Sequence, residues 1–571
     1  MMASRLSKTW PLVGGAIGLG SVLWGVWLML APQTAAVPAM LPPASPTTTP
    51  TNPATAAPTG AQAAGRTPLQ GGSGTWTADA PSASQAGSPG ALCPDCDIVV
   101  ITMCSMRRDH VSAYGLPPST LDGKPLTPAL DALTAGGFRM DDAWAASNFT
   151  LAGLTALLTG RFGSSTGVTG WDKGLVKDVP TLPEILGYYG YTTGGFTIDA
   201  PSGFRPDYGL DRGFQRMEII PPPRDTPDGR TSGGDIGPGG ASAKPAAAWI
   251  AAQDKTKPIF AMFHTRTAHY PFVLEEDATD TTGVTDLLWG AGGRHTSTQA
   301  MPGTAGGTAQ RGVVALTGQD PVQMGVLAAG APGIALWKQR YAEAVGRMDI
   351  DLAVIAAALE KRGRLDKTIV VVLADHGESI NDHGELLHGD AYFAGVVHIP
   401  LLIRVPGLKG GPVPALTSQV DVLPTLLDLV GAVTPADIDG SSMLPLFTGK
   451  AQSIRSATLV EGGVSWHDDG HPRGAVIAPP WAMLRQDRGC GGGPGAMRKQ
   501  GEPATCLYDM STDPTQDHNV AGARPDVTAD LQSRWDTFRA AHAGPDTTLT
   551  LDPAYVEELQ RTGYNFRPEE K

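Results

Sequence analysis

One short run, Thr-Ile-Val-Val-Val-Leu at 368–373, constrains the fold of this chain most strongly. A β-branched run of this length is typical of a strand buried on both faces of a parallel sheet. It leads directly into Ala-Asp-His-Gly-Glu at 374–378. In open α/β sheets, ligands bind beyond the carboxyl ends of the strands. The sequence therefore predicts that Asp375 and His376 lie in the functional site.

Two further strands are predicted to end in ionisable side chains. The run at 98–102 leads to Cys104, and the run at 258–263 leads to His264 and His269. Another strand is expected at 399–405, and helices at 130–133, 151–159 and 337–362 separate the strands. This alternation predicts an α/β fold with a mostly parallel sheet flanked by helices. Three strand ends would then meet at one edge of the sheet.

The N-terminal region predicts a membrane anchor. Arg5 and Lys8 precede an uncharged, mostly apolar run at 10–31, which is long enough to span a bilayer. The positive charges would stay in the cytoplasm, so the rest of the chain would lie outside the membrane, in the periplasm. The alternative is a cleaved signal peptide, because small residues follow at Ala35, Ala36 and Ala39.

The remaining sequence divides into three parts. Residues 32–96 are rich in Pro, Thr and Ala and are expected to form a disordered linker, because they offer little apolar surface to bury. Residues 97–450 are expected to form the α/β domain that carries the strand-end residues, with a Gly-rich insertion at 274–335. Residues 451–571 are expected to form a smaller α+β subdomain of short antiparallel strands and a last helix at about 527–541.

Charge and cysteines narrow the functional classes. The net charge of -13 argues against nucleic-acid binding, although a bound metal would still permit anionic substrates. Cys490 and Cys506 flank a Gly-rich stretch and could staple a hairpin. Cys93 and Cys96 favour a local disulfide over a redox pair or half of a zinc site. Cys104 is left over.

Three groups of residues are candidates for chemistry. Asp375 and His376 offer a hard oxygen and an imidazole to a metal, although a solvated polar turn has the same composition. Thr150 is placed as the N-cap of the helix at 151–159; it is either an ordinary cap or a nucleophile beside the positive end of the helix dipole. His264 and His269 could stabilise an oxyanion or protonate a leaving group.

These segments resemble sulfatase-like hydrolases and transferases of the alkaline phosphatase superfamily. The resemblance rests on 98–115, 126–133, 148–161, 209–214, 374–378, 420–431 and 507–514. It implies an alkaline-phosphatase-like fold, with Asp375 and His376 as metal ligands and Thr150 in the position of the nucleophile. It also implies that His264, His269 and His388 bind the substrate oxyanion or assist the leaving group.

Two departures from the family pattern change the expected chemistry. The segment Thr-Leu-Ala-Gly-Leu at 150–154 lacks the Cys/Ser-x-Pro-x-Arg motif that sulfatases mature to formylglycine, and Thr150 looks more like the nucleophile of phosphoethanolamine and phosphoglycerol transferases. Cys104 stands where the family has an acidic metal ligand. A thiolate suits Zn²⁺ better than Ca²⁺, Mg²⁺ or Mn²⁺, so Cys104, Thr150, Asp375 and His376 could form a four-coordinate zinc site.

The sequence therefore predicts a metal-dependent hydrolase of sulfuric or phosphoric esters, carried by a lipid or a polysaccharide. Two alternatives stay open. One is a transferase that acts on envelope components, and the other is a non-catalytic binding module on the same fold.

Overall fold

The structure, a computed structural model, describes residues 91–121, 123–198, 203–220, 242–269, 331–389, 391–463, 472–487, 489–490 and 503–561. The expected anchor at 10–31 lies outside these residues, as do the linker as far as residue 90 and the insertion from 270 to 330. No helix in the described ranges is both long enough and apolar enough to cross a bilayer.

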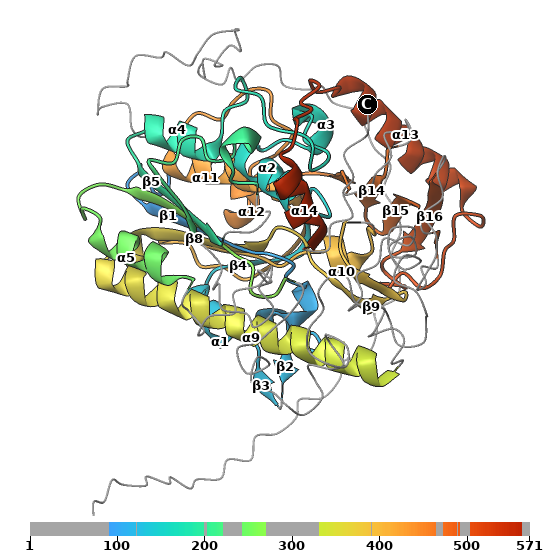
Figure 1. The fold of residues 1–571 in the computed structure, drawn as a ribbon, viewed down its shortest axis with the longest axis horizontal. Coiled ribbons are helices and arrows are strands. Elements are labelled where there is room, and N and C mark those ends of the chain that lie inside the picture. Colours follow the sequence, from blue (N-terminus) through green and yellow to red (C-terminus); the bar gives the residue numbers. More distant parts are fainter. Residues whose placement is uncertain are drawn as a thin grey trace, which may run out of the picture. The chain divides into compact units, whose positions relative to one another are not determined.

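An eight-stranded sheet forms the centre of the fold (Figure 1). Its strands, in spatial order, are β12 (Pro412–Ser418), β4 (Phe138–Trp144), β11 (Leu401–Arg404), β8 (Thr368–Ala374), β1 (Asp97–Met103), β7 (Ile259–Thr265), β5 (Thr192–Ile198) and β6 (Arg216–Ile220). In this sheet β11 is antiparallel to both of its neighbours, whereas all the other pairings are parallel. The predicted mostly parallel sheet is confirmed.

The three central strands β8, β1 and β7 are those that the sequence indicated most clearly. Every residue of these strands is buried, which explains their nearly continuous apolar sequences. The strands β4, β5, β6 and β12 were not predicted. β4 contains Arg139, Asp141 and Asp142, and β5 contains a Gly pair, so neither shows the apolar run of a central strand.

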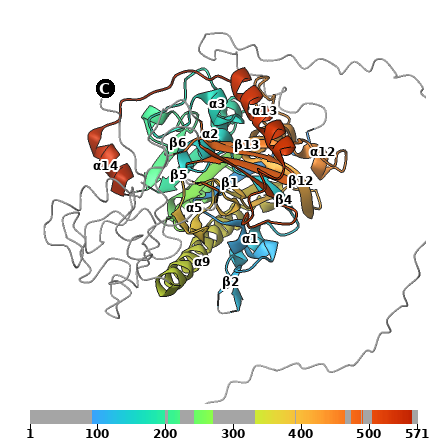
Figure 2. The ribbon, with the colours of Figure 1, turned by 90° about the vertical axis from the view of Figure 1, so that its right-hand side faces the viewer.

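Helices cover both faces of the sheet (Figures 1 and 2). One face carries α5 (Lys244–Ala252) and α9 (Ala331–Arg362), which pack on each other. The other carries α2 (Thr150–Thr159), α4 (Leu182–Tyr188) and α11 (Val422–Val430). All ten residues of α2 are buried, so this helix lies within the core. Its N-terminus therefore opens onto an interior site.

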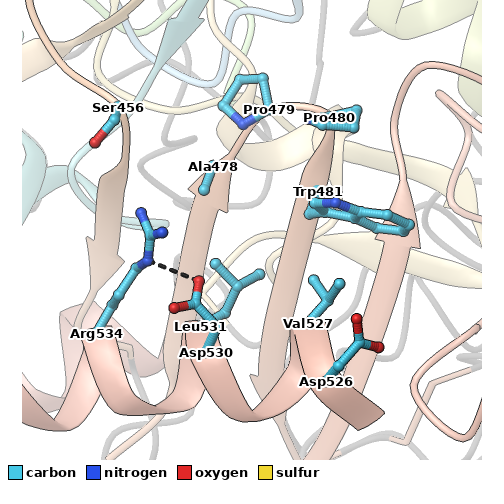
Figure 3. A pocket seen from close by; sticks show the side chains of 10 residues that line it. All are labelled: Ser456, Ala478, Pro479, Pro480, Trp481, Asp526, Val527, Asp530, Leu531 and Arg534. Carbon is cyan, nitrogen blue, oxygen red and sulfur yellow. Dashed lines mark hydrogen bonds and ion pairs between the residues drawn. The ribbon is translucent and has the colours of Figure 1, made fainter. Parts of the chain in front are cut away.

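The C-terminal part contains a four-stranded antiparallel sheet in the order β13 (Thr458–Glu461), β14 (Gly474–Ala478), β15 (Trp481–Gln486) and β16 (Ala504–Asp509). The predicted short strands are thus present. The helix α13 (Pro525–Ala541) packs Leu531 and Trp535 against this sheet. A pocket lies between α13 and the ends of these strands, where Arg534 pairs with Asp530 (Figure 3). None of its lining residues belongs to the predicted site.

The cysteines pair as favoured from their spacing. Disulfides join Cys93 to Cys96 and Cys490 to Cys506, so a half zinc site at the first pair is wrong. Cys104 is free and fully buried.

Candidate active site

Three potential metal ligands meet where β1 and β8 end. Cys104, Asp375 and His376 are fully buried, and each offers one ligand atom within 4.8 Å of the others. Met103 of β1 pairs with Ala374 of β8, so the residues that follow these two lie side by side. Adjacent parallel strands therefore place the thiol and the carboxylate together although 271 positions separate them in the sequence.

A left-handed turn at Ser105 directs the chain away from the sheet immediately after Cys104. Ser105 has a φ of 59°, which is unusual for a residue other than glycine. Its N–H donates to Asp375 Oδ1 at 3.2 Å, and its carbonyl accepts a hydrogen bond from the Tyr341 hydroxyl at 2.7 Å. These two contacts hold the strained turn and orient the carboxylate. No pattern in the sequence indicated that Ser105 contributes to the site.

The ring of His376 is held with one nitrogen available as a ligand. Its Nδ1 lies 2.8 Å from the Gly377 carbonyl, which can only accept, so Nδ1 carries the proton and Nε2 carries a lone pair. Burial lowers the pKa of His376 to about 4, so the ring is neutral near pH 7. A neutral imidazole is the form that binds a metal.

Asp375 is the second candidate ligand. Burial opposes its ionisation, but the neighbouring histidines and the His376 N–H hold its pKa below the ordinary value. Its Oδ2 is buried without a hydrogen-bond partner among the described residues. An ionised carboxylate oxygen that makes no hydrogen bond to a described residue and lies 3.5 Å from His376 Nε2, beside a thiol, fits a divalent ion. Burial and the Asp375 charge raise the pKa of the Cys104 thiol, so metal binding would displace its proton.

The hydroxyl of Thr150 lies beside this cluster. Its Oγ1 is 3.2 Å from His376 Nε2 and 3.5 Å from Cys104 Sγ. The expected position as N-cap is wrong by one residue. Phe149 is the cap, and Thr150 is the first residue of α2, which ends as predicted at Gly160 with a φ of 68°. The shift turns the side chain toward the strand ends, where it can act on a bound group.

Two contacts that the sequence did not indicate set the distance between α2 and the strand end. A Cβ on Gly153 would lie 2.9 Å from the Asp375 carbonyl oxygen, so this close approach requires glycine. The amide of Gln419 donates to that same carbonyl at 3.4 Å and accepts from Ala146 N–H at 3.1 Å. The only sequence feature that could have indicated this close approach is Gly153 itself, because a glycine inside a helical pattern often marks a close packing contact.

His264 was expected after a strand, but it lies within β7. Its ring Nδ1 is 2.8 Å from Thr102 Oγ1, and its Nε2 has no hydrogen-bond partner in the described ranges. Burial lowers its pKa to about 4, with the Arg266 charge acting in the same direction. A neutral His264 can therefore present Nε2 to a substrate oxygen.

His269 and His388 join the site through ring contacts. The ring of His388 lies 4.2 Å from that of His376 and 5.0 Å from that of His269, measured between centroids. Glu378 Oε1 lies 3.0 Å from His388 Nδ1 and orients the ring. By contrast, His383 bonds to the Thr515 carbonyl through Nε2 and belongs to the supporting structure.

Arg107 holds the loop that carries these groups. Its guanidinium donates to the Glu378 carbonyl at 2.8 Å and pairs with Asp109 and Asp382, each at 2.6 Å. Its charge is thus engaged by two carboxylates.

The structure brings together the seven residues that the sequence predicted for the site, which are Cys104, Thr150, His264, His269, Asp375, His376 and His388. Their individual roles stay predictions.

Known proteins share this fold. The family model described as Sulfatase matches residues 97–432. Mouse (Mus musculus) arylsulfatase K is 31% identical over 199 residues, which is 33% of this chain and 32% of that protein. Delta 4,5-hexuronate-2-O-sulfatase of Bacteroides thetaiotaomicron is 30% identical over 192 residues, or 32% of this chain and 36% of that one. The chain spans about a third of the length of these curated relatives.

Solved structures agree over a longer stretch. A 2-O GAG sulfatase superposes with a TM-score of 0.59 at 17% identity and covers 81% of this chain and 96% of its own. The phosphonate monoester hydrolase of Agrobacterium radiobacter superposes with a TM-score of 0.55 at 21% identity and covers 78% and 96%. The family model alone matches more than half of the sequence, and the sheet order and the strand-end site lie within the matched region. This chain belongs to the sulfatase family.

Proposed function

We propose that this chain is a divalent-metal-dependent hydrolase of sulfuric or phosphoric esters, with Thr150 as the nucleophile. The observation that carries the proposal is the position of the Thr150 hydroxyl, 3.2 Å from His376 Nε2 and 3.5 Å from Cys104 Sγ. A hydroxyl at this position adjoins two of the three candidate ligands of one ion. The start of α2 also adds a positive dipole end beside it.

Cys104, Asp375 and His376 would hold the ion. Its chemistry would be to lower the pKa of the Thr150 hydroxyl and to polarise the ester group. Zn²⁺ is favoured because a thiolate is a soft ligand, whereas an all-oxygen site would suit Ca²⁺ or Mg²⁺.

The chain's own residues would perform the remaining steps. The Thr150 hydroxyl loses its proton to solvent, and its Oγ attacks phosphorus or sulfur in line with the leaving oxygen while the bond to that oxygen breaks. His388 or His269 gives a proton to the leaving alkoxide, and Glu378 keeps the His388 ring in place through Nδ1. His264 Nε2 faces a non-bridging oxygen. Water then attacks the same phosphorus or sulfur, the bond to Thr150 Oγ breaks, and the proton that the water loses returns to the histidine.

The substrate class follows from the relatives only by analogy. One sulfatase-fold structure is in complex with its substrate D-glucosamine-2-N,6-O-disulfate, and another fold relative is a phosphonate monoester hydrolase. A sulfated saccharide or a phosphoric ester of an envelope component is therefore proposed here. The apolar run at 10–31 supports membrane anchoring with the site outside the membrane.

The test compares wild type, Thr150→Ala and Thr150→Ser on aryl sulfate, phosphate monoester, phosphodiester and phosphonate substrates, with Zn²⁺, Mn²⁺, Mg²⁺ or Ca²⁺ supplied separately. Thr150→Ala should lose at least about a thousandfold in kcat, because it removes the attacking oxygen. Thr150→Ser should retain activity. Mass spectrometry of a quenched reaction should find the covalent group on Thr150. Unchanged turnover in Thr150→Ala would exclude this residue as nucleophile.

Threonine in the nucleophile position also favours a second candidate function, transfer to an acceptor alcohol. The same reaction run with glycerol or a sugar as acceptor separates the two. A transferase forms the acceptor ester in preference to the free acid, whereas a hydrolase yields mostly free acid.

A further inference from the structure

A third ionisable residue lies in the same row as Cys104 and Asp375. Thr265 of β7 pairs with Met103 of β1, and Cys104 N–H donates to the Thr265 carbonyl at 2.9 Å, which extends the pairing one step beyond the strands. The next residue of β7 is Arg266. The ends of β8, β1 and β7 thus present a carboxylate, a thiol and a guanidinium side by side.

The register also fixes the face of the sheet to which these side chains point. Directly paired residues of neighbouring strands point to the same face, and the direction repeats every two residues. Thr102 and His264 form such a pair, with their side chains 2.8 Å apart. Cys104 and Arg266 follow two residues later on the same two strands. Arg266 is therefore directed to the side on which Cys104 meets Thr150.

Electrostatic effects support this placement. Arg266 is fully buried, so its charge is poorly screened by water. Burial raises the pKa of the Cys104 thiol, and the Arg266 charge acts in the opposite direction. Burial lowers the pKa of His264, and the same charge adds to that effect. One guanidinium thus influences both the Cys104 thiol and the His264 ring.

A fixed positive charge such as that of Arg266 would balance the negative charge that an ester substrate brings into the site. A thiolate and the Asp375 carboxylate together neutralise a divalent ion, and a sulfate or phosphate ester then brings one or two further negative charges. The helix α2, which begins at Thr150, contains no charged residue. Arg107 is engaged by Asp109 and Asp382.

Resting on the proposed function, we propose that Arg266 binds the non-bridging oxygens of the anionic group held over Thr150. A guanidinium can donate two parallel hydrogen bonds to such a group, which positions it as well as neutralising it. Arg266 would therefore favour a dianionic phosphate monoester over a monoanionic ester.

The test measures anion binding directly, in the metal-loaded full-length chain, without turnover. Inorganic phosphate, vanadate and sulfate are titrated calorimetrically into wild type, Arg266→Met and Arg266→Lys. Arg216→Met, which removes an exposed arginine paired with Glu218 on the outer strand β6, is the control for overall charge. Bound metal and the unfolding midpoint are recorded for each protein.

Arg266→Met should weaken phosphate binding at least about tenfold, because a hydrogen-bonded charge pair is lost. The loss for sulfate should be smaller, and bound metal should not change. Arg266→Lys should bind phosphate with intermediate affinity, since a point charge replaces the fork. In turnover assays, KM for a phosphate monoester should rise more than KM for a sulfate ester.

Equal phosphate affinity in wild type and Arg266→Met would overturn the inference, as would a wild type that binds none of the three anions. If Arg266→Met fails to fold, the test uses Arg266→Lys instead. In that case, unchanged affinity of Arg266→Lys for both phosphate and sulfate would overturn the inference. A wild type that binds phosphate through Arg266 but hydrolyses no ester would support this inference and contradict the proposed activity.

Discussion

The thiol of Cys104 lies 3.5 Å from the hydroxyl of Thr150, although the two residues are 46 positions apart and belong to different layers of the fold. Cys104 follows the central strand β1, and Thr150 begins the buried helix α2. A soft ligand and a candidate nucleophile therefore share one face of the same site. Under the proposed function, the preference for a soft or a hard metal would depend on Cys104.

Cys104→Asp should change the metal that the chain retains. A carboxylate in place of the thiol makes the site harder, so zinc affinity should fall at least about tenfold and Ca²⁺ or Mg²⁺ should compete better. Elemental analysis after dialysis against mixed metals measures this. Cys104→Ala, which supplies no ligand, should retain less of every metal. Equal zinc content in all three proteins would show that Cys104 is not a ligand.

Gly153→Ala should displace Asp375 through a contact with its backbone carbonyl. The new Cβ would meet the Asp375 carbonyl oxygen at 2.9 Å, and backbone cannot easily yield, so stability should fall by about 1–3 kcal/mol. Metal affinity should fall with it, because Asp375 must move. The matched control is Gly187→Ala in α4, where a Cβ would meet nothing within 4 Å. That change should stabilise the protein by about 0.5–1 kcal/mol in urea unfolding.

Asp97→Asn should destabilise the fold without changing metal content. Asp97 is buried at the start of β1, the opposite end from Cys104, and pairs with the equally buried Arg362 at 2.8 Å. Removing the charge leaves a buried guanidinium poorly compensated, at a cost of about 3–5 kcal/mol. Glu218→Gln breaks the more exposed Arg216 pair and should cost less than about 1 kcal/mol. Similar losses of stability in Asp97→Asn and Glu218→Gln would contradict a special role for the buried pair.

His398→Phe should make the protein less sensitive to acid. His398 stacks on Trp144 with ring centroids 4.4 Å apart, and burial, together with the Arg108 charge, lowers its pKa to about 3. An unfolded histidine titrates near pH 6.5, so between about pH 6.5 and 3 the unfolded chain binds the extra proton. Wild-type stability should therefore fall as the pH drops through this window.

The phenylalanine variant keeps the stacking but binds no proton in either state. Relative to wild type it should gain up to about 1.4 kcal/mol for each pH unit below 6. Urea unfolding at pH 7.5, 6.5, 5.5 and 4.5 measures the difference. His264 and His376 titrate in both proteins, so their contributions cancel in the stability difference between wild type and variant. Stability curves that stay parallel at every pH would rule out His398 as the source.

Local sequence predicted the central strands because β8, β1 and β7 are buried on both faces and therefore carry apolar, often β-branched side chains. It also predicted that Cys104, His264 and Asp375 would meet, because parallel strands deliver their carboxyl ends to one edge. The edge strand β12 and the charged strand β4 show no such pattern. Their pairing depends on partners distant in the chain.

The amino-acid sequence alone predicted the mostly parallel α/β fold from its apolar periodicity, and the rule for strand ends made Cys104, His264, His269, Asp375 and His376 candidates for the site. Thr150 was a candidate from its place at a helix start, and His388 from the family resemblance. Tertiary structure decided that Thr150 faces His376 at 3.2 Å, because that distance depends on how closely α2 can approach β8. Gly153 and Gln419 set this approach through contacts with the Asp375 carbonyl. Such contacts join positions more than 40 residues apart, so no local pattern encodes them.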